Sequence, residues 1–124
     1  MGENPQSMMS ENSGSFPFFH PVSKLIKGPI QIIGPEATAS DCARKMSEAS
    51  IGSLVVIAQQ SMIGIVTSTD LVEKVLALKK KDDCQVSKIM ISPVICISKS
   101  ETIFEALMLM IQKGISHLVI TEKD

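Results

Sequence analysis

The chain contains five short apolar runs that are rich in Ile, Val or Leu, each bounded by polar or turn-forming residues. Runs of this length that are rich in Ile and Val are typical of strands. The continuous apolar runs at 54–57 and 118–120 show the pattern of a buried strand. The runs predict strands at 30–33, 54–57, 62–66, 94–97 and 118–120.

The stretches between these strands show helical periodicity. A helix is expected over 38–47, and another over 71–80, where it ends at three lysines whose charge interacts favourably with the helix dipole. The residues expected to face inward in the first of these helices are Ala39, Cys42, Ala43 and Met46.

A third helix is expected after the strand at 94–97. Ser98 and Glu101 have the spacing of a capping box, and Gly114 stands where helices commonly end. The apolar residues that share one face of this helix are Ile103, Leu107, Met110 and Ile111.

The chain contains an internal repeat. Residues 22–60 align with residues 86–124 without a gap, and ten of the 39 aligned pairs are identical. The first copy continues with a further strand and helix, whereas the counterpart of 61–80 in the second copy would lie beyond Asp124. The element order predicts an α/β fold of the α+β type, built from tandem β-α-β-β-α units with the second unit incomplete.

Three segments are expected along the chain. Residues 1–20 are predicted to be a flexible tail or linker, because the first 15 residues are mostly polar and cannot bury enough apolar surface. The first unit is expected over 21–82 and the second, partial unit over 83–124. Phe16, Phe18 and Phe19 either pack on the nearest domain edge or dock a partner or neighbouring domain.

Composition excludes several classes of function. Twelve basic and thirteen acidic residues give a net charge of −1, with a pI near 6.1. Arg44 is the single arginine and there is no Trp or Tyr, which argues against a nucleic-acid partner. No apolar run approaches the roughly 20 residues of a membrane span, and the N-terminus lacks the apolar core of a signal peptide. We therefore expect a soluble, cytoplasmic protein without a membrane partner.

Metal-centred and covalent chemistry are not indicated. Cys42, Cys84 and Cys96 contain no C-x-x-C pair, so we expect neither a disulfide framework nor a zinc site. Cys42 and Cys96 lie in apolar patterns, where free cysteine behaves as a small hydrophobe. His20 is interpreted as a linker residue and His117 as an exposed residue opening a strand. Without a Ser–His–Asp order or an acid paired with a His, we expect no enzyme.

The best candidate for chemistry is the junction between the strand at 62–66 and the helix that follows. The hydroxyl of Thr67 and the next backbone N–H groups suit a phosphate at a helix start. Asp70 offers a carboxylate that can accept two hydrogen bonds from a ribose diol, and Gly64 lets a flat base approach the backbone. Thr67-x-x-Asp70 is also the pattern of an ordinary capping box, so capping alone remains the alternative.

The element order, the tandem repeat and the run Gly64-Ile65-Val66-Thr67-Ser68-Thr69-Asp70-Leu71 together resemble the CBS domain, the family named after cystathionine β-synthase. Its signature of Gly, two apolar residues, Thr or Ser, two free positions and Asp is matched at Gly64, Thr67 and Asp70. The resemblance covers about 22–124. It implies a pseudo-twofold pair of units, a Bateman module, with the second unit truncated.

The resemblance also implies a function. A regulatory module is expected to sense an adenosine-containing nucleotide (AMP, ADP, ATP or S-adenosylmethionine) in the cleft between its units and to control an attached or partner effector domain of a larger protein. No cofactor is required. The implied ligand-binding residues are Gly64, Ile65, Thr67, Ser68 and Asp70, with Pro29, Ile30, Ser53 and Leu54 at the starts of two strands. The alternative is a purely structural dimerisation or docking module without a ligand.

Two departures from the family pattern shape this expectation. The second unit has no signature of its own, so one chain supplies at most one complete site. The Arg or His that often holds the phosphates is replaced at best by Lys24, Lys27 or Lys88, which act as flexible point charges and favour weakly bound ligands with few phosphates. The half-built second unit leaves strand 118–120 with an open edge, and such edges recruit partners, so we expect a homodimer.

Overall fold

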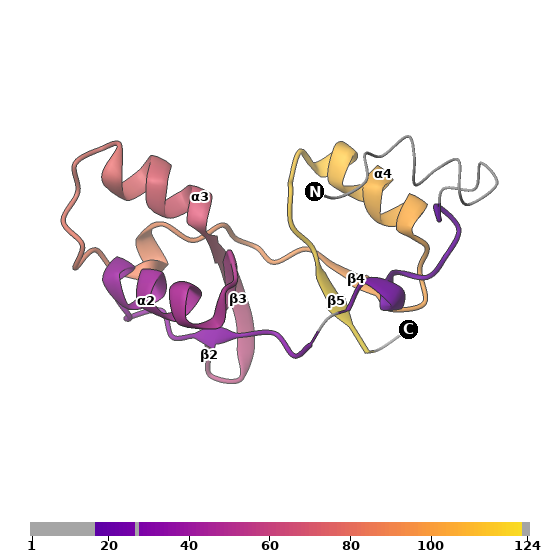
Figure 1. The fold of residues 1–124 in the computed structure, drawn as a ribbon, viewed down its shortest axis with the longest axis horizontal. Coiled ribbons are helices and arrows are strands. Elements are labelled where there is room, and N and C mark those ends of the chain that lie inside the picture. The colour runs from indigo at the N-terminus through magenta and orange to yellow at the C-terminus, as the bar shows by residue number, and fades with distance from the viewer. Residues whose placement is uncertain (1–16, 27, 123–124) are drawn as a thin grey trace, which may run out of the picture. The chain divides into compact units, whose positions relative to one another are not determined.

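The computed structural model describes residues 17–26 and 28–122, and these form two compact units (Figure 1). Of the described residues, unit 1 contains 17–26 and 95–122, and unit 2 contains 28–94. Both units combine helices with short strands, so the predicted mixed α/β class is confirmed.

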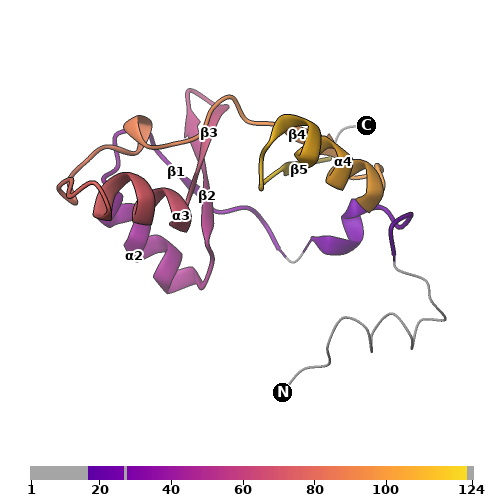
Figure 2. The same ribbon diagram turned by 90° about the horizontal axis from the view of Figure 1, so that it is seen from above.

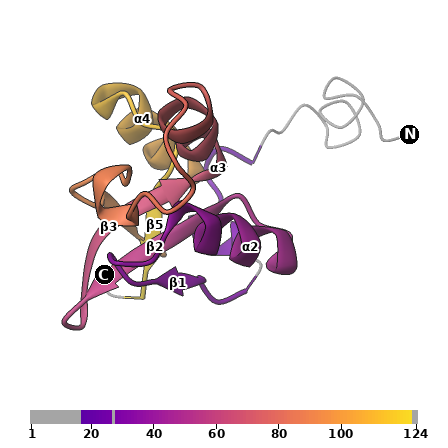
Figure 3. The same cartoon turned by 90° about the vertical axis from the view of Figure 1, so that its left-hand side faces the viewer.

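Unit 2 is built on a three-stranded sheet in the order β1–β2–β3 (Figure 3). Its strands are β1 Ile32–Ile33, β2 Ser53–Ala58 and β3 Ser61–Thr67. β1 runs parallel to β2, and β3 runs antiparallel to it. The hairpin between β2 and β3 turns at Gln59 and Gln60, whose backbones are left-handed with φ of 52° and 68°. The two strands of this hairpin lie where the apolar runs predicted them.

Two helical segments pack with this sheet. α2 Ala39–Ala49 begins with a capping box in which Thr38 and Asp41 exchange two hydrogen bonds of 3.0 Å. α3 Ser68–Asp70 continues directly into the π-helix η2 Leu71–Leu76. The helix predicted over 71–80 therefore begins three residues earlier and ends at Leu76. It ends there because the chain turns, with Lys79 in the left-handed region at φ 57°.

The core of unit 2 is formed by one face of α2 together with β2, β3 and η2. Its buried residues are Ala39, Cys42, Met46, Leu54, Val56, Val66, Val75, Val86 and Ile89. Ala43 was expected to face inward, but it is exposed. The buried stripe of α2 is narrow, and Ala39, Cys42 and Met46, at i, i+3 and i+7, already fill it.

Unit 1 is built around a two-stranded parallel sheet of β4 Cys96–Ser98 and β5 Val119–Thr121. α4 Ile103–Lys113 connects the two strands along the chain, and Figure 2 shows these three elements together. The buried core residues are Val22, Ile97, Ile103 and Ala106. Gly114 ends α4 in the left-handed region at φ 65°, as the sequence predicted.

The start of α4 differs from the prediction. Thr102 and Glu105 form the capping box, with hydrogen bonds of 2.9 and 3.1 Å, in place of Ser98 and Glu101. Ser98 is unavailable because it is still part of β4, where it pairs with Thr121. The face that Leu107 shares with Ile111 is exposed, since Ile103 and Ala106 face the core of unit 1.

The two repeats exchange their lead-in segments, which are the stretches 22–26 and 86–90 that begin each repeat. In unit 2 the Val86 N–H donates to the carbonyl of Ala37 at 2.8 Å, and in unit 1 the Val22 N–H donates to the carbonyl of Glu101 at 2.8 Å. Val22 and Val86 begin the 3-10 helices η1 Val22–Leu25 and η3 Val86–Lys88. Val22 and Val86 are 64 positions apart, and so are Ala37 and Glu101. This spacing is the offset of the repeat, so the two bonds are equivalent. Compact packing and sequence repetition therefore divide the chain at different points.

Aromatic residues gather at the N-terminal end of α4. The ring of Phe18 lies edge-on to Phe104 with centroids 6.4 Å apart, and Phe19 lies 6.0 Å from the same ring. The N–H of Phe104 also donates to the carbonyl of Phe18 at 2.8 Å. Phe18 and Phe19 thus pack within unit 1. Residues 1–16, which include Phe16 and most of the predicted tail, lie outside the described residues.

Candidate functional site

The residues singled out in the sequence converge on one end of the unit 2 sheet. β3 is antiparallel to β2, so its last residue, Thr67, pairs with the first residue of β2, Ser53. β1 is parallel to β2, so the segment leading into it, with Pro29 and Ile30, approaches the same end. The topology thus brings together the starts of two strands and the end of a third.

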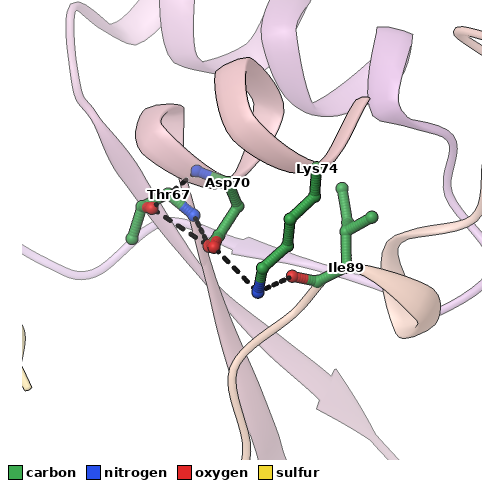
Figure 4. A network of polar contacts seen from close by, with 4 residues as sticks. All are labelled: Thr67, Asp70, Lys74 and Ile89. Atoms are coloured by element: carbon green, nitrogen blue, oxygen red, sulfur yellow. Dashed lines mark hydrogen bonds and ion pairs between the residues drawn. The ribbon is translucent and has the colours of Figure 1, made fainter. Parts of the chain in front are cut away.

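Thr67 and Asp70 form a buried capping box at this end of the sheet (Figure 4). The Thr67 N–H and hydroxyl donate to Oδ2 of Asp70 at 2.8 and 3.0 Å, and the Asp70 N–H donates to the Thr67 hydroxyl at 3.2 Å. Thr67 is 3% exposed and Asp70 is 4% exposed. The capping interpretation of this motif is therefore realised in full.

Lys74 completes the network. Its ammonium lies 3.1 Å from Oδ1 of Asp70 and donates to the carbonyl of Ile89 at 3.0 Å. The lysine side chain is 41% exposed, whereas that of Asp70 is 6% exposed, so the ion pair joins a buried carboxylate to a partly exposed lysine. Since a carboxylate offers about four acceptor sites, the three hydrogen-bonding groups here leave Oδ1 able to accept one more.

Gly64 is buried under the chain that follows η3. A Cβ atom at this position would lie 2.6 Å from Sδ of Met90 and 3.0 Å from the carbonyl oxygen of Ile91. Ile65 and Ile91 pair as an isolated bridge, with N–H to O distances of 2.9 and 2.7 Å. The close approach that requires this glycine is thus made by the Met90 side chain and the Ile91 carbonyl, where the sequence suggested a flat base.

The other predicted site residues differ in accessibility. Ser68 is exposed, and its N–H donates to the carbonyl of Gly52 at 2.9 Å. Ser53 is half-buried, and Pro29 and Ile30 are exposed. The side chains of Leu54 and Ile65 are buried in the unit. The N–H and the carbonyl of Ile65 are both already bonded to Ile91.

Lys74 is the cation beside Asp70, and it was not among the lysines predicted for the site. Of those lysines, Lys24 belongs to unit 1, Lys88 is exposed in unit 2, and Lys27 lies outside the described residues. The signal that could have found Lys74 is its spacing: Asp and Lys at i and i+4 face each other on a helix.

No group of three or more His, Cys, Asp or Glu residues able to hold a metal ion occurs in the described part of the chain. Cys42, Cys84 and Cys96 are free thiols, and Cys96 is exposed even though it lies in an apolar pattern. His20 and His117 are both exposed. Within residues 17–26 and 28–122, no helix has the length and apolarity to span a membrane.

Sequence comparison identifies relatives of this arrangement. The family model of the CBS domain matches residues 22–77 and 86–124. An uncharacterised protein of Methanopyrus kandleri is 40% identical over 92 residues, covering 73% of this chain and 47% of the relative. An uncharacterised 17.7 kDa protein of Acidianus ambivalens is 31% identical over 104 residues, covering 83% of this chain and 62% of the relative. The chain thus spans about half to two thirds of the length of these relatives.

Solved structures show the same fold. An uncharacterised conserved protein from Pyrococcus horikoshii is 25% identical with a TM-score of 0.78, covering 87% of this chain and 83% of that chain. A hexameric CBS-CP12 protein from bloom-forming cyanobacteria is 27% identical with a TM-score of 0.77, covering 87% and 62%. A CBS domain protein from Pyrobaculum aerophilum, solved in complex with AMP, is 22% identical with a TM-score of 0.73, covering 83% and 79%.

The chain belongs to the CBS domain family, with one match in each repeat. The family that the sequence resembled is thereby confirmed, and so is the tandem fold. Proteins of this family are regulatory ligand-binding modules and are generally not catalytic.

Proposed function

We propose that this chain is a regulatory module that binds an adenosine-containing nucleotide at the Thr67–Asp70 end of the unit 2 sheet. The observation that carries the proposal is the convergence of Ser53, Thr67 and Asp70 with the segment at Pro29 and Ile30 on one edge. Family membership and the AMP bound by the Pyrobaculum aerophilum neighbour support it.

The contacts suggest a division of roles. Oδ1 of Asp70 has one acceptor position left, and a ribose hydroxyl is a suitable donor for it. Lys74 supplies a positive charge beside that carboxylate for a phosphate. The backbone at Gly64 is covered by residues 90–91, so it offers adenine no surface. The exposed side chain of Ile30 offers an aliphatic surface in its place.

The charge of the site favours a ligand with few phosphates. Lys74 is one cation on a flexible stem and already shares its charge with Asp70. Each added phosphate brings negative charge towards the Asp70 carboxylate, with no arginine to hold it. We therefore expect AMP to bind more tightly than ADP or ATP. S-Adenosylmethionine, which carries no phosphate, remains a ligand to test.

A thermal melting screen against AMP, ADP, ATP, S-adenosylmethionine and GTP tests the proposal. A ligand that binds the folded chain alone stabilises it by about 2.7 kcal/mol at a hundredfold excess over Kd. Asp70→Asn should abolish the shift. Asp41→Asn is the matched control, because it disrupts the same type of capping box away from the site and should leave the shift intact. Equal loss of the shift in both variants, or no shift with any ligand, would count against nucleotide binding.

The second candidate is a purely structural module. It is favoured by the completeness of the Thr67–Asp70–Lys74 network, which accounts for the burial of Asp70 without a ligand. In the described part of the chain, every buried side-chain nitrogen or oxygen atom has a hydrogen-bond partner. A flat melting profile across all five ligands would favour this function.

We further infer that the module acts as a homodimer and controls an attached or partner effector domain. The large apolar residues exposed on both units support self-association. The cyanobacterial neighbour is described as hexameric, which shows that this fold is compatible with assembly. Sedimentation of the full chain across micromolar concentrations tests the oligomeric state, and a stable monomer would contradict it.

A further inference from the structure

Unit 1 has an open groove between α4 and β4. Its volume is about 650 Å³. The floor is apolar, and the two charged side chains that line it, Glu101 and Glu105, are both acidic. The hydrogen bond from the Thr102 N–H holds the pKa of Glu105 below its ordinary value, so this carboxylate is ionised at neutral pH. The apolar lining residues are Cys96, Ile97, Phe104, Met108 and Leu109.

The repeat shows why this groove exists. In unit 2, Lys45 on α2 donates a hydrogen bond to the carbonyl of Ile32 at the edge of the sheet. The residue 64 positions later is Leu109, which cannot make this bond, and Met108 likewise stands where the first repeat has Arg44. The polar face of α2 has thus become an apolar face in α4. Met108 remains 40% exposed at this face.

Unit 2 carries a surface of the opposite charge. Leu76 is 71% exposed and Leu78 is 62% exposed. Lys79, Lys80 and Lys81 follow directly and are all exposed. This segment, 76–81, joins an apolar patch to three positive charges, whereas the groove joins an apolar floor to two negative charges.

We propose that the groove of unit 1 in one copy of the chain receives segment 76–81 of unit 2 in a second copy. Leucine side chains would cover the floor at Met108, and the lysines would meet Glu101 and Glu105. Each copy has one groove and one segment, so two copies make this contact twice when each groove receives the other copy's segment. The inference rests on the proposed homodimer and is independent of nucleotide binding.

The experiment is sedimentation velocity of the full chain without nucleotide, at several concentrations. We expect a dimer. Met108→Arg restores the residue type of the first repeat and puts a cation in the groove, so it should raise the dissociation constant about tenfold or more. The single reversals Glu101→Lys and Lys80→Glu should each weaken the dimer about threefold, because rim charge pairs are individually weak. Combining both reversals should restore the wild-type dissociation constant.

Lys88→Glu is the matched control, because it reverses an exposed charge of unit 2 outside segment 76–81 and should leave the dimer unchanged. Circular dichroism melting of each variant distinguishes loss of association from loss of folding. A monomer at every concentration overturns both the homodimer and this contact. A dimer that tolerates Met108→Arg, or one that the double reversal fails to restore, overturns this contact while leaving the homodimer in place.

Discussion

Oδ1 of Asp70 and Nζ of Lys74 lie 3.1 Å apart, and the same ammonium donates to the carbonyl of Ile89 at 3.0 Å. Lys74 therefore links the Asp70 carboxylate, which is the proposed ligand-binding group, to Ile89, the buried residue that follows η3. Anything that draws Lys74 towards a phosphate changes both bonds at once. This gives the proposed site a direct physical connection to residues 86–91.

Replacing Lys74 by Met should lower the free energy of unfolding by about 1 kcal/mol, because the buried Asp70 carboxylate and the Ile89 carbonyl each lose a donor. Lys88→Met, at an exposed position nearby in the sequence, should have little effect. Urea unfolding followed by circular dichroism measures both. A Lys74→Met chain as stable as wild type would show that the ion pair contributes nothing.

Gly64→Ala should lower the free energy of unfolding by about 1–3 kcal/mol, because the new methyl group overlaps Met90 and the backbone of Ile91. The matched control is Gly34→Ala, where no atom lies within 4 Å of the added Cβ and no comparable loss is expected. Chemical unfolding of the two variants side by side tests this. Equal stability of the two would mean that residues 90–91 do not pack on β3 as described.

Thr38→Ala and Thr102→Ala should each destabilise the chain by about 1 kcal/mol, the usual effect of removing an N-cap hydroxyl. Each hydroxyl accepts a hydrogen bond from the backbone N–H at the third helical position. Melting temperatures of the two variants check the prediction. Thr69→Ala, at an exposed threonine that is not an N-cap, is the control and should cause no comparable loss.

The same caps make stability depend on pH. Hydrogen bonds from the Thr38 N–H and hydroxyl, and then Arg44, hold the pKa of Asp41 below its ordinary 3.8; Glu105 is likewise held below 4.5 by Thr102. The folded carboxylates therefore bind protons less readily than the unfolded ones. Their contribution is fully present above these ordinary values and is lost as pH falls through the lower folded values. Melting temperature should decline below about pH 4.5, and by less in Asp41→Asn.

The three thiols should differ sharply in reactivity. Burial raises the pKa of the Cys42 thiol to about 11, and the neighbouring charge of Asp41 adds to the effect. Cys42 should therefore stay protonated and unlabelled at pH 8, whereas the exposed Cys96 reacts with a thiol reagent. Mass spectrometry after timed labelling shows the order, and urea should release the reactivity of Cys42. Early labelling of Cys42 in the folded chain would contradict its burial.

Much of the fold could be predicted because local signals agreed with tertiary packing. The hairpin of β2 and β3 and the end of α4 at Gly114 follow from apolar runs, polar turns and a left-handed glycine. The start of α4 was misassigned because Ser98 and Thr102 are equally good caps locally. Strand pairing of Ser98 with Thr121, which no local pattern reveals, decided between them.

The candidate site was predictable in part for a similar reason. Thr67 and Asp70 form a pattern that is visible in the sequence, and they do lie together. The cover over Gly64 was not visible, because it is made by residues 90–91, far along the chain. Lys74 was overlooked although its spacing from Asp70 is a local signal, and Ala43 was misplaced because periodicity alone does not give the width of the buried face.

The exchange of lead-in segments determines the order in which the two units can fold during synthesis. Hydrogen bonds join residues 18–23 to residues 99–104, so the N-terminal segment leaves the ribosome long before its partner exists. Unit 2 is completed by 86–90, the start of the second repeat, and can close as soon as that stretch emerges. Unit 1 must then form by a loop closure over some 80 residues, which makes it the slower half to mature and the half most exposed to mispairing with a neighbouring nascent chain.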